Sequence, residues 1–349
     1  MKKIALLTAL LASINSFAFD TWWHAECTRK AMVANGFSAD ARLAAQVSNY
    51  ITDFHSAALF GTGIPEKQRV EVLKLKQEMS YEYMHFDAIF TTADIRQNWD
   101  KIFANTVQAL KKYYNNPEVK SGFRLIILYN ILGASLHIVQ DFYSHSNWVN
   151  TYVTNRKLPV PTWYGEDSLY RNSLTLFTGA YPDGSVKGMK GHSELNKDCS
   201  TIPLNKEAVE VAERASVEWI KMIMDATPEL PWGELKSYNI QGDAVLRNFL
   251  VKLDATFLTS SSVVAGHLDG SQPARYIFSA DKDMVKEKAM AFQALNLTLG
   301  EYAAYLTLER NIYKIPSPYW AGFRVYYITR DLADGLSHSN RKYSRPRTN

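Results

Sequence analysis

The stretch from residue 123 to 149 constrains the fold most, because it combines a helical apolar pattern with three regularly spaced polar residues. His137, Asp141 and His145 follow one another every four residues, so an α-helix places them on one face within an arc of about 80°. The apolar run from Leu125 to Leu136 is too short to span a membrane and predicts a buried helix. Two imidazoles and a carboxylate on that helix predict a divalent metal site, with zinc as the first expectation.

The alternative interpretation is an ordinary i,i+4 pair of His137 and Asp141, with His145 in a histidine cluster of the core. Other residues in ligand-like sequence contexts favour the metal site, because one site would then account for most of the eight histidines. These residues are His24, Asp53, His85 and His192.

The first eighteen residues predict a secretory signal peptide. They begin with Met-Lys-Lys, continue with an apolar run, and carry small residues at Ser16 and Ala18, a pattern that is cleaved before Phe19. We therefore expect a protein secreted to the periplasm or to the outside of the cell. Loss of Lys2 and Lys3 takes the formal charge from +4 to +2, which gives no strong indication of nucleic-acid binding.

Two cysteines, Cys27 and Cys199, are present, and export permits a disulfide between them. Cys27 lies three residues after His24, and Cys199 lies seven residues after His192. If both histidines line one site, the two cysteines come close together. We therefore predict a disulfide between them.

Helical patterns dominate residues 19–230 and predict a mainly α-helical catalytic domain. The expected helices cover 21–34, a stretch from 38 that carries Asp53, 66–79, 94–114 and 206–225, and a long loop rich in Pro, Gly, Ser and Thr covers 157–190. Proline and glycine from 228 to 233 end this domain. Residues 231–349 mix possible strands with a helix and predict a smaller α+β or β-rich module.

Residues 136–148, Leu-His-Ile-Val-Gln-Asp-Phe-Tyr-Ser-His-Ser-Asn-Trp, resemble the signature of the heterokaryon-incompatibility C-type proteins and of related bacterial zinc metallophospholipases C. Both groups belong to an all-helical superfamily that includes secreted phospholipases C and the fungal single-strand zinc nucleases. The match is specific over these thirteen residues, is spread thinly over 19–225, and does not cover the chain after 232. It implies an all-helical zinc-cluster domain.

In that superfamily three zinc ions share a cleft, and the mature N-terminal residue binds one of them through its amino and carbonyl groups. The resemblance gives this role to Phe19, although Phe replaces the usual Trp. The full set of zinc ligands that it implies is Phe19, His24, Asp53, His85, His137, Asp141, His145, His192 and Asp198.

The sequence departs from the superfamily pattern at two places. His145 follows Asp141 by four residues instead of the usual six, as in the heterokaryon-type branch. The last ligand of the pattern would fall on Asn196, and Glu194 and Asp198 are the alternatives. We favour Asp198, because an anionic ligand offsets the charge of zinc better than a neutral amide.

The resemblance implies a zinc-dependent phospholipase C that acts as a monomer on a phospholipid membrane or micelle. It would hydrolyse a glycerophospholipid, phosphatidylcholine in the first place, to diacylglycerol and the phosphorylated headgroup, and Asp53 would orient or deprotonate the attacking water. Four aromatic residues near ligand positions are expected either to bind a choline cation or to pack in the core: Tyr81, Tyr83, Tyr143 and Trp148. The rival functions are a zinc-dependent single-strand nuclease or nucleotidase, and a non-catalytic membrane-interaction protein with a vestigial zinc site.

Overall fold

The computed structural model describes residues 21–58, 85–117, 121–181, 183–198, 202–239 and residue 332. This part of the chain is mainly helical and contains isolated β-bridges but no β-strand, which confirms the expected helical domain. The expected signal peptide, the helix expected at 66–79 and most of the expected C-terminal module lie outside the described residues. The helices are α2 (Thr21–Ala34), α3 (Ala39–Ala58), α5 (Thr92–Asn115), α6 (Ser121–His145), α7 (Trp148–Thr154), α8 (Ser168–Ser173), α9 (His192–Leu195), α10 (Asn205–Ala226) and α11 (Trp232–Lys236).

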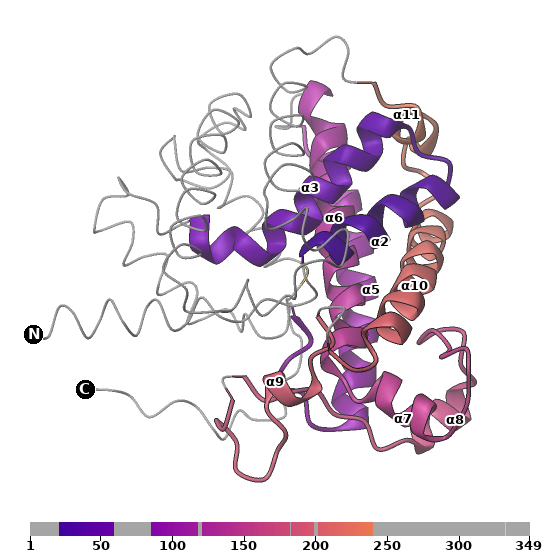
Figure 1. Cartoon of the computed structure of the whole chain (residues 1–349). Coiled ribbons are helices and arrows are strands. Elements are labelled where there is room, and N and C mark those ends of the chain that lie inside the picture. Colours follow the sequence, from indigo (N-terminus) through magenta and orange to yellow (C-terminus); the bar gives the residue numbers. More distant parts are fainter. Residues whose placement is uncertain are drawn as a thin grey trace, which may run out of the picture.

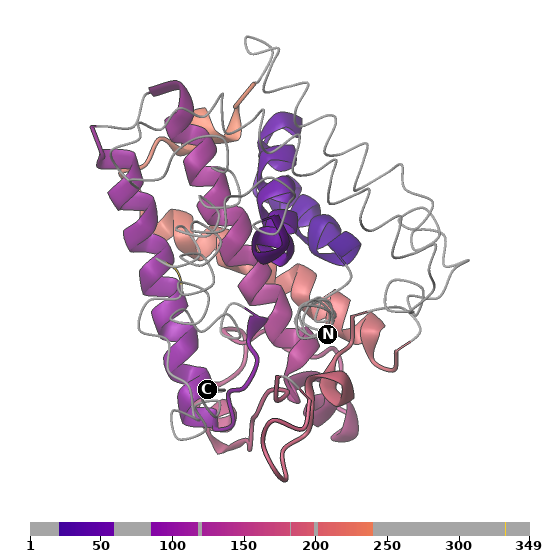
Figure 2. The ribbon, with the colours of Figure 1, turned by 90° about the vertical axis from the view of Figure 1, so that its left-hand side faces the viewer.

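Helix α6 lies at the centre of this bundle. It packs against α2, α3, α5 and α10 (Figure 1), and every residue from 127 to 146 is buried. A helix that is covered on all sides needs apolar residues around its whole circumference, which explains the apolar run that the sequence shows. Figure 2 shows α5 and α6 running side by side.

Gly133 lets α3 approach α6 closely. A Cβ atom at this position would lie 2.4 Å from the carbonyl oxygen of Ala45 and 2.8 Å from the backbone nitrogen of Asn49, so any larger residue would push the helices apart. The hydroxyl of Ser48 donates to the carbonyl oxygen of Asn130 at 2.8 Å across the same contact. The close approach brings Asn49 beside the polar face of α6.

The pattern expected to run to residue 149 is broken between α6 and α7. The side chain of Asn147 accepts a hydrogen bond from the nitrogen of Phe177 at 3.0 Å and donates to the carbonyl oxygen of Thr175 at 2.9 Å. The hydroxyl of Ser146 accepts from the nitrogen of Trp148 at 3.2 Å, which starts the next helix. The long loop is therefore tied to the end of α6, and α7, α8 and α9 gather near that end (Figure 1).

Backbone hydrogen bonds place two irregular segments, 85–90 and 177–180, against this end of α6. The nitrogen of Ala88 donates to the carbonyl oxygen of Gly179 at 2.7 Å, and the nitrogen of Gly179 donates to the carbonyl oxygen of His145 at 3.0 Å. A Cβ atom on Gly179 would lie 2.5 Å from the Cα atom of His192. The glycine thus allows His85 and His192 to meet the polar face of α6.

The remaining helices cover the core. The apolar face expected for α10 is buried, and its buried residues include Ala208, Val211, Ala212, Ala215 and Trp219. Leu332 is buried, and its carbonyl oxygen accepts a hydrogen bond of 2.8 Å from Asn105 of α5. In the described ranges, no helix is long and apolar enough to cross a membrane.

Candidate metal centre

Three histidines surround the carboxylate of Asp141. Its Oδ1 atom lies 3.0 Å from Nε2 of His24, and its Oδ2 atom lies 2.8 Å from Nδ1 of His85 and 3.1 Å from Nε2 of His137. His24 comes from α2, His137 and Asp141 come from α6, and all four residues are buried. Ligand atoms of His24, His137 and Asp141 lie within 4.8 Å of one another, so this first group could hold a metal ion.

Two amide side chains orient the histidines of the first group. Nδ1 of His24 lies 2.7 Å from Oε1 of Gln140, and Nδ1 of His137 lies 3.1 Å from Oδ1 of Asn49. The amide nitrogen of Asn49 donates to Oε1 of Gln140 at 2.9 Å, which fixes the orientation of both amides. An amide oxygen only accepts hydrogen bonds, so Nδ1 of each imidazole carries the proton and Nε2 faces Asp141.

The protonation states of the first group suit a bound cation. Burial, together with the neighbouring imidazole of His24, lowers the pKa of His137 to about 3 against the influence of Asp141, so the imidazole of His137 is neutral at neutral pH. Burial acts to raise the pKa of Asp141, but the neighbouring histidines, His137 first, hold it well below its usual value. A neutral imidazole and an ionised carboxylate are the forms that bind metal ions.

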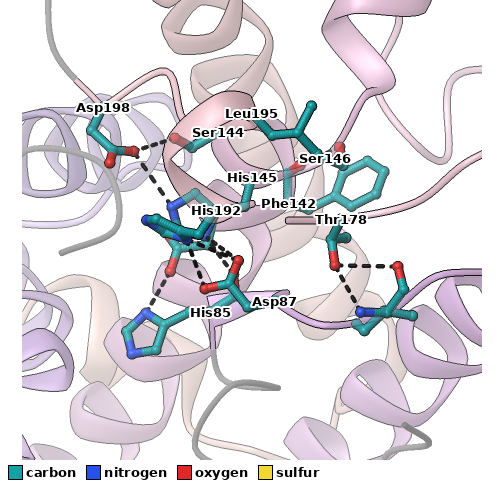
Figure 3. Close-up of polar contacts among 12 residues, drawn as sticks. His85, Asp87, Phe142, Ser144, His145, Ser146, Thr178, His192, Leu195 and Asp198 are labelled. Carbon is teal, nitrogen blue, oxygen red and sulfur yellow. Dashed lines mark hydrogen bonds and ion pairs between the residues drawn. The ribbon is translucent and has the colours of Figure 1, made fainter. Parts of the chain in front are cut away.

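A second group lies one helical turn further along α6, around His145 (Figure 3). Nδ1 of His145 lies 2.7 Å from the carbonyl oxygen of His85 and 3.6 Å from Oδ1 of Asp87, whereas Nε2 lies 3.4 Å from Oδ1 of Asp198. Both carboxylate oxygens of Asp87 also lie near Nδ1 of His192, at 3.0 and 2.9 Å. Ligand atoms of Asp87, His145 and His192 lie within 4.8 Å of one another.

The second group carries an excess of negative charge. Burial acts to lower the pKa of His145, but the carboxylates of Asp87, Asp141 and Asp198 outweigh it and raise the pKa to about 10. Among the described residues, Nε2 of His145 and Oδ2 of Asp198 are buried atoms with no hydrogen-bond partner. Buried polar atoms without partners cost free energy, and a cation bound by these atoms would compensate that cost. The residues present therefore fit a metal ion.

The structure brings together most of the ligands that the sequence suggested. Seven of them lie in the two groups or next to them: His24, His85, His137, Asp141, His145, His192 and Asp198. Phe19 lies outside the described residues, and so does the side chain of Asp53, which belongs to α3.

The three alternatives for the last ligand occupy different environments. Asp198 is buried beside His145, and its Oδ1 atom also accepts a hydrogen bond from the hydroxyl of Ser144. Glu194 is exposed, and its carboxylate accepts from the nitrogen of Gly191 at the start of α9. Oδ1 of Asn196 is a buried atom that has no hydrogen-bond partner in the described part of the chain.

Sequence analysis missed Asp87. This residue follows His85 by two positions in a segment without helical or strand periodicity, so no pattern placed its side chain. The closeness of Asp87 to His85 in the sequence was the available signal, because residues two positions apart lie in the same region of the fold. In the structure, His85 contacts Asp141 and Asp87 contacts His192.

Two of the aromatic residues considered for choline binding are part of the core. Tyr143 and Trp148 are fully buried, the hydroxyl of Tyr143 accepts from the nitrogen of Trp163 at 2.9 Å, and Trp148 donates to the carbonyl oxygen of Pro161 at 2.9 Å. Both contact the ring of Phe142. This is the packing alternative stated for them above. Tyr81 and Tyr83 lie outside the described residues.

The predicted disulfide is wrong, because Cys27 is a free thiol. Its side chain is buried in the hydrophobic core, and this burial raises the pKa of the thiol well above its usual value. An apolar environment keeps the thiol protonated and unreactive. Cys199 lies outside the described residues.

Comparison with protein-family models, with curated proteins and with solved structures found no match. Five imidazoles and three carboxylates lie together in a buried region, where two groups of them could hold metal ions. Such a set can bind cations and, through them, anionic groups such as phosphate.

Proposed function

We propose that this chain is a secreted zinc-dependent phosphodiester hydrolase of the phospholipase C type. The observation that carries the proposal is the pair of buried His/Asp groups that share α6. Asp141 and His145 are separated by one helical turn, which corresponds to about 6 Å along the axis. Ions in the two groups would be near enough to act on one phosphodiester.

Zinc is the proposed ion because of the ligand chemistry. Imidazole nitrogen and carboxylate oxygen are the ligands available in both groups, and this mixture suits zinc better than magnesium or calcium, which prefer oxygen alone. The resemblance around residues 136–148 points to the same ion and to three ions per chain. In this proposal Phe19, exposed by signal cleavage, completes the set of ligands.

The residues of the chain would position the reactants. When bound, zinc ions would acidify a water molecule and neutralise charge on the phosphate oxygens. Asp53, which lies one turn after Asn49 in α3, would orient that water or accept its proton. His24, His85, His137 and Asp141 would hold zinc at one end of the phosphodiester, and His145 with His192 would hold it at the other. The buried surroundings strengthen each of these electrostatic contacts.

A phospholipid is the proposed substrate for two reasons. The thirteen-residue stretch resembles the metallophospholipase branch, and the formal charge of +2 that remains after signal removal offers little attraction to a polynucleotide. Hydrolysis between glycerol and phosphate would give diacylglycerol and a phosphorylated headgroup.

The test is the release of phosphocholine from phosphatidylcholine micelles by the mature protein that begins at Phe19. We expect release that a chelator stops and that added zinc restores. The variant His137→Ala should fall to the background rate, because it removes a ligand of the first group and leaves Asp141 with one imidazole fewer. The control Asp225→Ala alters only an exposed ion pair with Lys221 and should keep full activity.

Two results would count against the proposal. Full activity of the His137→Ala variant would show that the metal site takes no part in the reaction. Zinc-loaded protein that hydrolyses single-stranded nucleic acid or nucleotides, and no phospholipid, would assign the site to the nuclease alternative.

A further inference from the structure

The geometry points to Asp87 as a positioning residue, which holds His192 so that Nε2 and not Nδ1 of this histidine binds a metal ion. The backbone carbonyl of His85 would hold His145 in the same way, and Asp198 would supply the carboxylate ligand. Segment 85–87 would therefore orient both histidines of the second group. Asp87 itself would not bind the metal ion of that group. The inference rests on the proposed function in one respect, namely that a metal ion binds this group.

The hydrogen bond of His145 leaves one nitrogen for a metal ion. Nδ1 lies 2.7 Å from the carbonyl oxygen of His85. A carbonyl oxygen only accepts, so Nδ1 must carry a proton, and Nε2 is the nitrogen that can bind a metal ion once the ion displaces its proton. Asp87, whose Oδ1 lies 3.6 Å from this same Nδ1, is on the side of the ring that does not bind.

Asp198 lies on the other side of the His145 ring (Figure 3). Its Oδ1 atom is 3.4 Å from Nε2 but does not form a hydrogen bond with it. Within the described residues, Nε2 of His145 and Oδ2 of Asp198 are both buried and without a hydrogen-bond partner. An imidazole nitrogen and an anionic oxygen that lie close together and lack partners form the arrangement of two ligands of one ion.

Asp87 makes the contact that a supporting carboxylate makes in metal sites. Its two oxygens lie 3.0 and 2.9 Å from Nδ1 of His192, and a histidine that binds metal commonly donates its other N–H to a carboxylate or carbonyl oxygen. The first group follows the same rule, since the amide oxygens of Gln140 and Asn49 face Nδ1 of its histidines. Asp87 differs from these acceptors because it is a carboxylate and not an amide.

The competing arrangement uses Asp87 as a ligand together with Nδ1 of His145 and of His192. It would require His145 to give up its hydrogen bond of 2.7 Å to His85. The buried carbonyl would then lose its donor, which is costly. It would also leave Nε2 of His145 and Oδ2 of Asp198 without the partner that a cation provides.

Two variants separate the arrangements by zinc binding to chelator-stripped protein. Asp87→Asn keeps an oxygen that can accept from His192, so we expect it to bind as many zinc ions as the wild type, one of them about tenfold to a hundredfold more weakly. Asp198→Asn should bind one zinc ion fewer. Asp225→Asn, a change at an exposed carboxylate, serves as the matched control and should behave as the wild type.

A second measurement uses the wild-type chain, so its result does not depend on whether a variant folds. Protein with ¹⁵N-labelled histidine rings is loaded with ¹¹³Cd, and the nitrogen that couples to cadmium is identified. We expect coupling to Nε2 of both His145 and His192. Coupling to Nδ1 of either histidine, or loss of one zinc ion by Asp87→Asn, would overturn the inference while leaving the proposed function intact. A wild-type chain that binds no zinc would overturn both.

Discussion

Lys197 shows how a single buried charge supports the candidate site. Its ammonium group is buried and donates to the carbonyl oxygens of Ser144 at 3.0 Å, Ser146 at 2.9 Å and Leu195 at 2.7 Å. The first of these carbonyls belongs to the last turn of α6, where the helix dipole favours a positive charge. The lysine thus fastens the end of α6 to the segment that carries Asp198.

We predict that Lys197→Met lowers the free energy of unfolding by about 3 kcal/mol, because three buried carbonyl oxygens lose their donor. Urea denaturation followed by circular dichroism measures the change. The matched variant Lys221→Met removes an exposed lysine and should change the value by less than about 0.5 kcal/mol. Equal stability of the Lys197→Met protein and the wild type would show that the three hydrogen bonds contribute nothing.

At the scale of elements, the packing of α3 on α6 links the fold to the site. Gly133 permits the approach, and Asn49, which lies across from it on α3, accepts the hydrogen bond from His137. A change in the distance between these helices therefore changes the orientation of a candidate ligand. The first group depends on this helix contact as much as on its own residues.

We predict that Gly133→Ala destabilises the protein by about 1–3 kcal/mol through overpacking, although alanine favours a helix by about 1 kcal/mol over glycine. Zinc affinity should fall as well, since Asn49 must move. The comparison is Gly233→Ala in α11, where an added Cβ meets no atom within 4 Å. That variant should be neutral or slightly stabilised. Should Gly133→Ala match it in both stability and zinc affinity, the link between helix contact and site would be refuted.

The helices that were predicted well are those in which the spacing of apolar residues in the sequence matches the buried face. The helices α2, α3, α5 and α10 lie close to the expected ranges, because each buries one face and its sequence repeats accordingly. The end of α6 was placed too late, because the side chain of Asn147 bonds to residues 175 and 177, which the local sequence does not indicate.

Some candidate ligands could likewise be predicted from local spacing, and others depend on tertiary contacts. His137, Asp141 and His145 share a helix, so their spacing alone indicated one face. Asp87 lies beside His192 because backbone hydrogen bonds join two segments about ninety residues apart in the sequence. One of these bonds joins Ala88 to Gly179. No local pattern carries that information, and the choice between Glu194 and Asp198 depended on the same tertiary contacts.

For the molecule as a whole, we propose that the buried histidines and carboxylates form a zinc centre. The described part of the chain buries eight such residues in two adjoining groups, and a bound cation would stabilise the folded chain over the unfolded one. For a single site, free zinc at about one hundred times its Kd adds roughly 2.7 kcal/mol. Zinc content and folding stability should therefore change together.

The most direct measurement is the zinc content of the mature chain purified without added metal, followed by thermal unfolding before and after chelation. The account predicts at least two zinc ions per chain, a lower Tm after their removal, and recovery of the original Tm when zinc is returned. A chain that is purified without bound metal and whose Tm does not change when zinc is added would contradict it.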